Sequence, residues 1–79
     1  MFVKKPDISE WARDCKTIGE QIRRYGYASN QMPDDVVKDE WNKTVKAIQG
    51  FANKYGMDYG TAEQIGGIVA DSVALGLAF

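Results

Sequence analysis

The sequence predicts an all-α fold, a small up-down-up three-helix bundle, and three observations support this. Apolar residues recur at alternating steps of three and four, the spacing that places side chains on one face of a helix. Residues suited to capping a helix stand where each apolar stripe begins. The two connections are short, which favours antiparallel neighbours. We therefore expect a single domain over residues 1–79, with about 70% helix against the usual third.

The first predicted helix covers residues 7–25. Asp7 can cap its first turn, and Glu10 stands three places later, where its carboxylate can reach back to the cap amide. The helix should end at Gly26, because glycine readily adopts the left-handed conformation common at helix ends. Its apolar stripe consists of Ile8, Trp11, Cys15, Ile18, Ile22 and Tyr25.

The second predicted helix covers residues 34–55, after a connection at 27–32. Proline is tolerated in a first helical turn, which fits Pro33, and the carboxylates of Asp34 and Asp35 suit the positive end of the helix dipole. Gly56 should end the helix. Its apolar stripe, which we expect to face the core, consists of Val37, Trp41, Val45, Ile48, Phe51, Ala52 and Tyr55.

The third predicted helix covers residues 61–78, with Thr61 and Gln64 as a capping pair and an alternative start at Asp58. Its larger apolar side chains spread over about 200° of the helix, wider than on either earlier helix. On its back, small residues recur every four positions: Gly66, Ala70, Ala74 and Ala78. We expect an outer ridge on which another helix can lie closely. Alternatively, alanine simply favours helix, and the strip is solvated or faces inward.

Composition excludes several classes of function. Ten basic and eleven acidic residues give a net charge of −1, which makes nucleic-acid binding a weak alternative because such domains usually carry a marked basic excess. The chain has no histidine and one cysteine, which excludes an internal disulfide and a structural zinc site. The N-terminal residues lack the apolar core of a signal peptide, and residues 65–79 fall short of the ~20 needed to span a bilayer. We expect a soluble cytoplasmic protein that does not bind membranes.

No catalytic constellation is present in the sequence. Cys15 lies on an apolar stripe and has no histidine to activate it. The cluster of Asp34, Asp35, Asp39 and Glu40 could hold Mg²⁺ or face a basic partner, but compensation of the helix dipole already accounts for acids in first turns. We therefore expect no enzymatic activity, no cofactor and no metal.

Protein binding is the function that the sequence favours. Aromatic residues and methionine are enriched in the cores of protein interfaces, and Tyr27 and Met32 lie in the predicted first connection, although such side chains could equally plug the end of the bundle. An up-down-up bundle brings them to the same end as the acidic cluster and Phe79, which suits a partner with a basic rim. The predicted contact residues are Tyr27, Met32, Asp34, Asp35, Asp39, Ala70, Ala74 and Phe79.

The specific hypothesis is a non-enzymatic adaptor or inhibitor that occupies a surface of a larger protein. Small phage and bacterial accessory proteins are similar to it in size and in lacking motifs, an analogy of type that carries no residues with it. One alternative is a self-assembling structural subunit packed through the third helix, which then forms a homo-oligomer. A weaker alternative is a protein associated with nucleic acid.

Overall fold

The computed structural model describes residues 7–76, which form three helices: α1 (Ile8–Gln31), α2 (Asp34–Tyr55) and α3 (Tyr59–Ala74). Helices make up 89% of these residues, and this part of the chain contains no strand. All three helices pack against one another. The predicted all-α three-helix bundle is confirmed. Within the same range, no helix has the length and apolar character required to cross a lipid bilayer.

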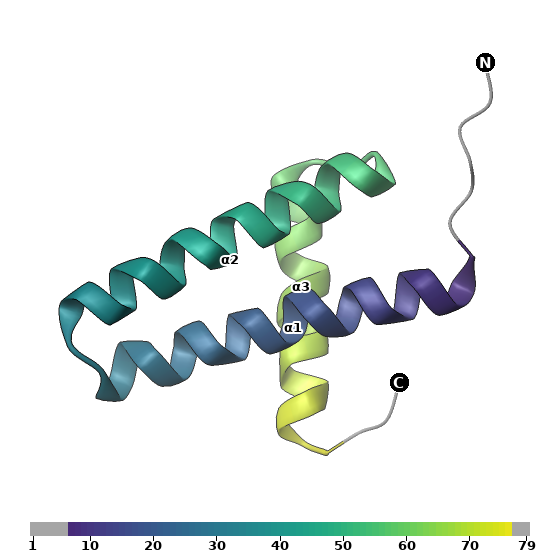
Figure 1. Ribbon diagram of the computed structural model, residues 1–79. Helices are drawn as coiled ribbons and strands as arrows, with labels where there is room; N and C mark the ends of the chain where they lie inside the picture. Colours follow the sequence, from purple (N-terminus) through teal and green to yellow (C-terminus); the bar gives the residue numbers. More distant parts are fainter. Residues whose placement is uncertain (1–6, 77–79) are drawn as a thin grey trace.

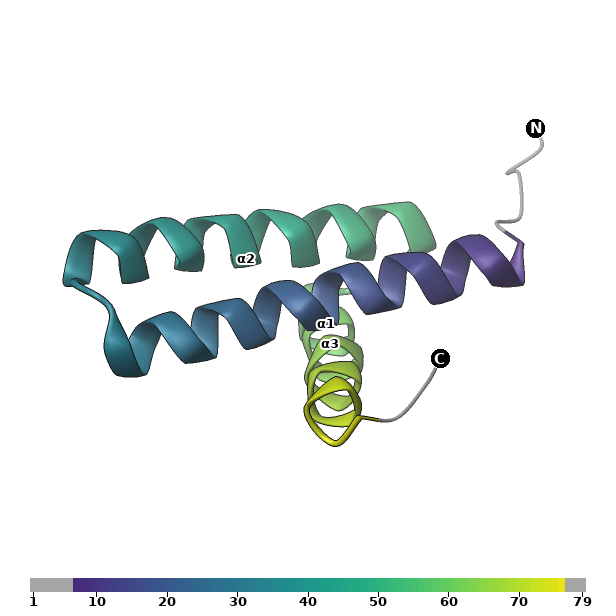
Figure 2. The same ribbon diagram turned by 60° about the horizontal axis from the view of Figure 1, so that its bottom comes forward.

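The direction of α3 differs from the up-down-up arrangement that short connections favour. α1 and α2 run side by side as an antiparallel hairpin, and α3 crosses this hairpin steeply (Figure 1). In the turned view α3 is seen almost along its axis, while α1 and α2 still run across the picture (Figure 2). Because it crosses the hairpin instead of lying along it, α3 covers only part of the hairpin's length.

α1 continues past Gly26, the residue at which its spacing and glycine chemistry predict an end. The carbonyl of Gly26 accepts hydrogen bonds from Ser29 Oγ at 2.9 Å and Asn30 Nδ2 at 3.1 Å, so both side chains bind the continuing helix. The helix ends instead at Met32, which is extended (φ −108°, ψ 158°) because a residue preceding proline, here Pro33, is disfavoured in the helical conformation. Residues 27–31 are therefore helical.

The remaining helix ends follow from caps and glycines. The Asp7 carboxylate accepts a hydrogen bond from the Glu10 amide at 2.7 Å, as predicted. Gly56 ends α2 in the left-handed conformation at φ 69°, also as predicted. The alternative start of α3 is the correct one, because the Asp58 carboxylate accepts a hydrogen bond from the Thr61 amide at 2.7 Å. α3 ends at Ala74, short of the predicted residue 78, and Gly76 follows with φ 76°.

The core lies where the three helices meet, and α1 and α3 approach each other closely there. A Cβ atom added at Gly19 would stand 2.5 Å from Val69 Cγ1 and 3.1 Å from the backbone nitrogen of Ala70. The core consists of Cys15, Ile18, Ile48, Phe51, Ala52, Ala62 and Val69. The crossing therefore depends on a glycine at position 19 of α1.

The same contact corrects the prediction of an outer ridge on α3. Gly66 and Ala70 are buried, and a Cβ atom added at Gly66 would lie 2.5 Å from Ile22 Cδ1. The small residues face α1 because a small surface on each helix permits close backbone approach. Ala74 is exposed one turn further on, and Ala78 lies outside the described residues.

We expect Gly19→Ala to destabilise the protein by about 1–3 kcal/mol, because the added methyl group must displace Val69 or the backbone of α3. Gly50→Ala is the matched control. Gly50 lies inside α2 with open space at its Cβ position, so alanine there should stabilise by about 0.5–1 kcal/mol. Urea unfolding followed by circular dichroism measures both changes. Equal effects at the two sites would contradict the close crossing.

Candidate protein-binding surface

Trp41 is exposed at the joined end of the hairpin, although its spacing predicts a core position. The residue is 43% exposed, and its ring lies tilted against that of Tyr25 from α1, with the ring centres 5.1 Å apart. Val37 and Val45 stand one turn before and after it on α2 and are only half-buried. The prediction that Trp41 lies in the core is wrong because α3 crosses the hairpin elsewhere and leaves this part of the α2 stripe uncovered.

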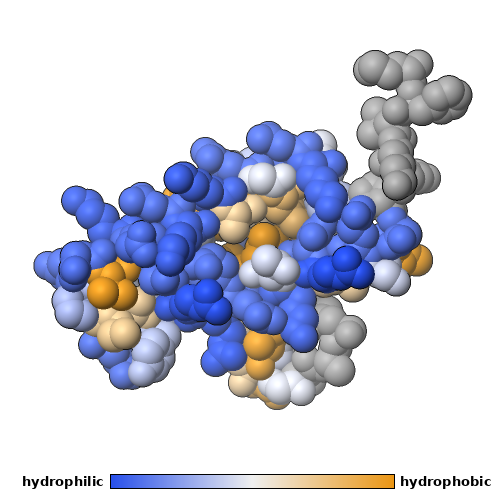
Figure 3. Space-filling model, in the orientation of Figure 1, coloured by the Kyte–Doolittle hydropathy of each residue, from blue (hydrophilic) through white to orange (hydrophobic). Residues whose placement is uncertain are grey.

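We call this region the tip surface and define it as Tyr25, Met32, Val37, Trp41 and Val45. Met32 lies in the connection between α1 and α2 and is 45% exposed. Apolar atoms reach the surface at the end of the molecule where these two helices join (Figure 3). The tip surface thus combines two aromatic rings in contact with aliphatic and thioether side chains, a composition typical of interface centres.

The predicted acidic residues divide into two groups. Asp34 and Asp35 are exposed in the first turn of α2, next to Met32. Asp39 lies one turn further along, where its carboxylate is 3.1 Å from Lys43 Nζ, so its charge is largely compensated. Among the described residues, the structure brings Met32, Asp34 and Asp35 together as predicted and leaves Asp39 bound to a lysine.

The other predicted contact residues lie elsewhere. Tyr27 is 59% exposed but belongs to α1, not to a loop, and it lines a shallow depression with Arg23, Arg24, Glu20 and Val73 of α3. Ala70 is buried against α1, so its predicted role as a surface contact is wrong. Ala74 is exposed at the end of α3, and Phe79 lies outside the described residues.

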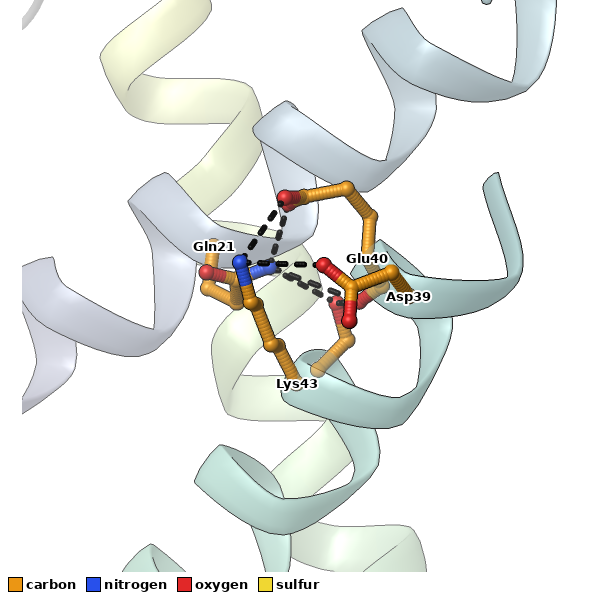
Figure 4. A network of polar contacts seen from close by, with 5 residues as sticks. Gln21, Asp39, Glu40 and Lys43 are labelled. Atoms are coloured by element: carbon orange, nitrogen blue, oxygen red, sulfur yellow. Dashed lines mark hydrogen bonds and ion pairs between the residues drawn. The ribbon is translucent and has the colours of Figure 1, made fainter. Parts of the chain in front are cut away.

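A buried polar network joins the two helices beside Trp41 (Figure 4). Gln21 Nε2 of α1 donates hydrogen bonds to Glu40 Oε2 at 3.0 Å and to Thr44 Oγ1 at 3.3 Å. The Thr44 hydroxyl in turn donates to the Glu40 carbonyl at 2.8 Å, and Lys43 Nζ lies 3.6 Å from the Glu40 carboxylate. Sequence reasoning missed this network because it grouped Glu40 with the exposed acids, yet only 9% of the residue is exposed.

This network fixes the register of the hairpin at the tip surface. A buried carboxylate must be paired or hydrogen-bonded, and Gln21 and Lys43 together satisfy Glu40. The hydrogen bonds from Gln21 place it opposite Glu40 and Thr44, whereas Lys43 lies on the same helix as Glu40. A glutamine on one predicted helix, together with a glutamate and a threonine one turn apart on the next helix, is the sequence signal that could have indicated this network.

A second polar cluster joins the opposite end of the hairpin. The carboxylate of Asp14 accepts hydrogen bonds from Lys54 Nζ at 2.7 Å and from the Tyr55 hydroxyl. The hydrogen bond from Lys54 holds the pKa of Asp14 below its usual range, and the Tyr55 hydroxyl acts in the same direction. Removal of water around Tyr55 and its bond to Asp14 raise its pKa to about 12. This cluster ties α1 to α2 electrostatically.

Two features of residues 7–76 bear on metal binding and on the reactivity of the single thiol. Within residues 7–76, no three cysteine or acidic side chains come close enough together to hold a metal ion. Cys15 is 5% exposed, and burial raises the pKa of its thiol, which keeps it in the unreactive protonated form.

No protein-family model, curated protein or solved structure matches the chain. The surface of the molecule itself is therefore the basis for inferring its function.

The two tryptophans should differ in their contribution to stability. Trp11 packs on Phe51 at 5.2 Å and edge-on against Tyr55 at 4.7 Å, so Trp11→Ala should cost about 3 kcal/mol or more. Trp41→Ala should cost only about 1 kcal/mol, because it loses chiefly the contact with Tyr25. Urea unfolding of both variants measures the difference. A larger loss of stability for Trp41→Ala than for Trp11→Ala would mean that Trp41 lies in the core.

Stability should fall in acid partly through Asp14. Its pKa is lowered in the folded protein, so its stabilising contribution is present above the usual value of 3.8 and is lost as pH falls through the lower folded value. Asp14→Asn should be less stable than the wild type at neutral pH, and the gap should close in acid. Unfolding midpoints measured across this range test the effect.

Tyr55 should cause a loss of stability at the alkaline end of the pH range. Because its pKa is raised to about 12, the wild type should lose stability as pH rises from 10 towards 12. Tyr55→Phe should show a smaller alkaline loss, because groups such as Lys54 and Tyr59 with raised pKa values still contribute, and it should retain a loss in acid. Parallel alkaline titration curves for the two proteins would contradict the assignment.

Proposed function

We propose that this protein is a non-enzymatic binding module, an adaptor or inhibitor that occupies a surface of a larger protein through its tip surface. The observation that carries the proposal is the exposed Trp41, whose ring contacts Tyr25 in an apolar row that residues 7–76 leave partly uncovered. Tryptophan and tyrosine dominate the energetically important positions of protein interfaces. An exposed apolar row of this kind suits a partner whose own apolar side chains bury it on binding.

The charges beside the tip surface favour a partner with a basic rim. Asp34 and Asp35 are exposed in the first turn of α2 and lie next to Met32, at the edge of the apolar centre. An interface of this form has an apolar centre that supplies most of the affinity and a charged rim that steers association. The acidic pair should therefore influence the association rate and the salt dependence more than the final affinity.

Rigidity of the hairpin supports binding by this surface. The network of Gln21, Glu40 and Thr44 holds α1 and α2 in register directly beside Trp41. A surface that is already in its bound conformation loses less entropy on association. The proposed mode of action is therefore occlusion, in which a preformed face covers a site on the partner. The single cysteine, buried as a free thiol, favours the cytoplasm as the place of action.

The proposal is tested with the immobilised full chain and a lysate of the native host. Proteins retained by the wild type are identified by mass spectrometry, and the affinity of each is then measured by calorimetric titration. Trp41→Ala should weaken binding by about tenfold or more, the effect expected of a central interface tryptophan. Gln49→Ala, on an exposed position of α2 outside the tip surface, is the matched control and should leave binding unchanged.

Charge reversal tests the rim separately. Asp35→Lys should slow association several-fold at low salt and reduce the salt dependence of binding, with little change in the dissociation rate. A partner that binds Trp41→Ala as tightly as the wild type would overturn the proposal, whatever the effect of Asp35→Lys.

A further inference from the structure

An apolar notch lies between α1 and α3, away from the tip surface. Its volume is ≈ 310 Å³, and its walls come from the N-terminal half of α1 and the middle of α3. The residues that line it are Trp11, Ala12, Cys15, Ile65, Ile68 and Val69. None of these side chains carries a charge. The notch results from the steep crossing of the two helices, which leaves an angle between them that no described part of the chain fills.

Apolar side chains project beside this notch. Ile68 is 68% exposed on its wall, and Leu75, seven residues later and so on the same stripe of α3, is 76% exposed. Ile8 is 86% exposed and precedes Ala12 and Cys15 on the notch-facing stripe of α1. Apolar atoms are visible at the free end of α3 (Figure 3). The same face therefore carries both the notch and exposed apolar side chains of a kind that could fill such a notch.

We propose that a second copy of this chain docks at the notch in a two-fold dimer, with the exposed side chains of each copy entering the notch of the other. A two-fold contact requires a surface that is complementary to itself, and a face with both hollow and projections meets that requirement. The proposal does not depend on the function assigned to the tip surface. It differs from the contact expected from sequence, because the small-residue ridge of α3 is already used within the chain.

The charges flanking the notch agree with this occupant. Lys16, next to Cys15 on α1, has a side chain that is 60% exposed and only a long 4.0 Å ion pair with Glu20. Asp71, three residues after Ile68 on α3, is exposed. When α1 of one copy faces α3 of the other, Lys16 of each copy faces Asp71 of its partner. A two-fold dimer therefore contains this pair of opposite charges twice. The net charge of −1 gives little repulsion between copies.

The expected dimer is weak and depends on concentration, because a few exposed side chains on a small domain bury less area than a stable interface requires. Sedimentation equilibrium of the full chain over a wide concentration range should show monomer and dimer in exchange. Ile68→Asp should raise the dissociation constant by about tenfold or more, since a buried isoleucine is replaced by a charge. The high exposure of Ile68 means that the variant should keep its helical circular dichroism spectrum.

Three further single variants and one double variant locate the contact. Met32→Asp changes an exposed apolar residue of the tip surface in the same way and should leave the dimer unchanged. Lys16→Glu and Asp71→Lys should each weaken the dimer by about threefold to tenfold, because each breaks two exposed ion pairs, and the double variant should restore it. Recovery in the double variant is specific to a direct contact between the two positions.

Three results would overturn the proposal. A wild type that is monomeric at every concentration excludes a second copy as the occupant of the notch. The occupant is then a different protein or the chain's own terminal residues. A dimer unaffected by Ile68→Asp lies elsewhere on the molecule. A double charge reversal that stays as weak as the single variants removes the two-fold pairing of Lys16 with Asp71.

Discussion

The close approach of α1 and α3 at Gly19 is the contact on which the rest of the structure depends. A side chain at that position would collide with Val69 and with the backbone of α3, so the absence of a Cβ atom sets both the distance and the direction of the crossing. Gly66 performs the complementary role against Ile22. Because the two helices touch through small surfaces, α3 can cross the hairpin steeply and bury Gly66 and Ala70 against α1.

That crossing decides which apolar surfaces remain open. α3 lies over one part of the hairpin, where Ile18, Ile48 and Phe51 form the core with it. The row around Trp41 and the notch beside Cys15 are left on either side. The polar network at Glu40 and the cluster at Asp14 hold the hairpin together where α3 does not cover it. Both proposed contacts therefore follow from the way in which one helix packs.

Local sequence signals predicted much of the fold. Helical spacing located all three helices, and the residue types at Asp7, Gly56 and Asp58 correctly indicated helix boundaries. The predicted end of α1 was wrong because a glycine inside a helix has the same local signature as one that ends it. At Gly26 the deciding signal was Pro33, seven residues later, which prevents Met32 from being helical.

The direction of α3 and the composition of the surface could not be predicted in the same way. Steric contact at Gly19 depends on what faces it, and the sequence does not state that the facing residue is Val69. Trp41 has the spacing of a core residue, and only the path of α3 leaves it exposed. Glu40 has the composition of a surface residue, and only the position of Gln21 explains its burial.

The central claim, that the steep crossing leaves Trp41 more exposed than Trp11, which packs against the core, is tested most directly by fluorescence quenching. Trp11→Phe leaves Trp41 as the single tryptophan, and Trp41→Phe leaves Trp11, so excitation selective for tryptophan reports on one ring in each variant. Acrylamide should quench Trp41 efficiently and its emission should lie at longer wavelength, whereas Trp11, which packs on Phe51 and Tyr55, should be protected and emit at shorter wavelength. Equal protection of the two rings in a monomer would mean that α3 lies along the hairpin and would contradict the account.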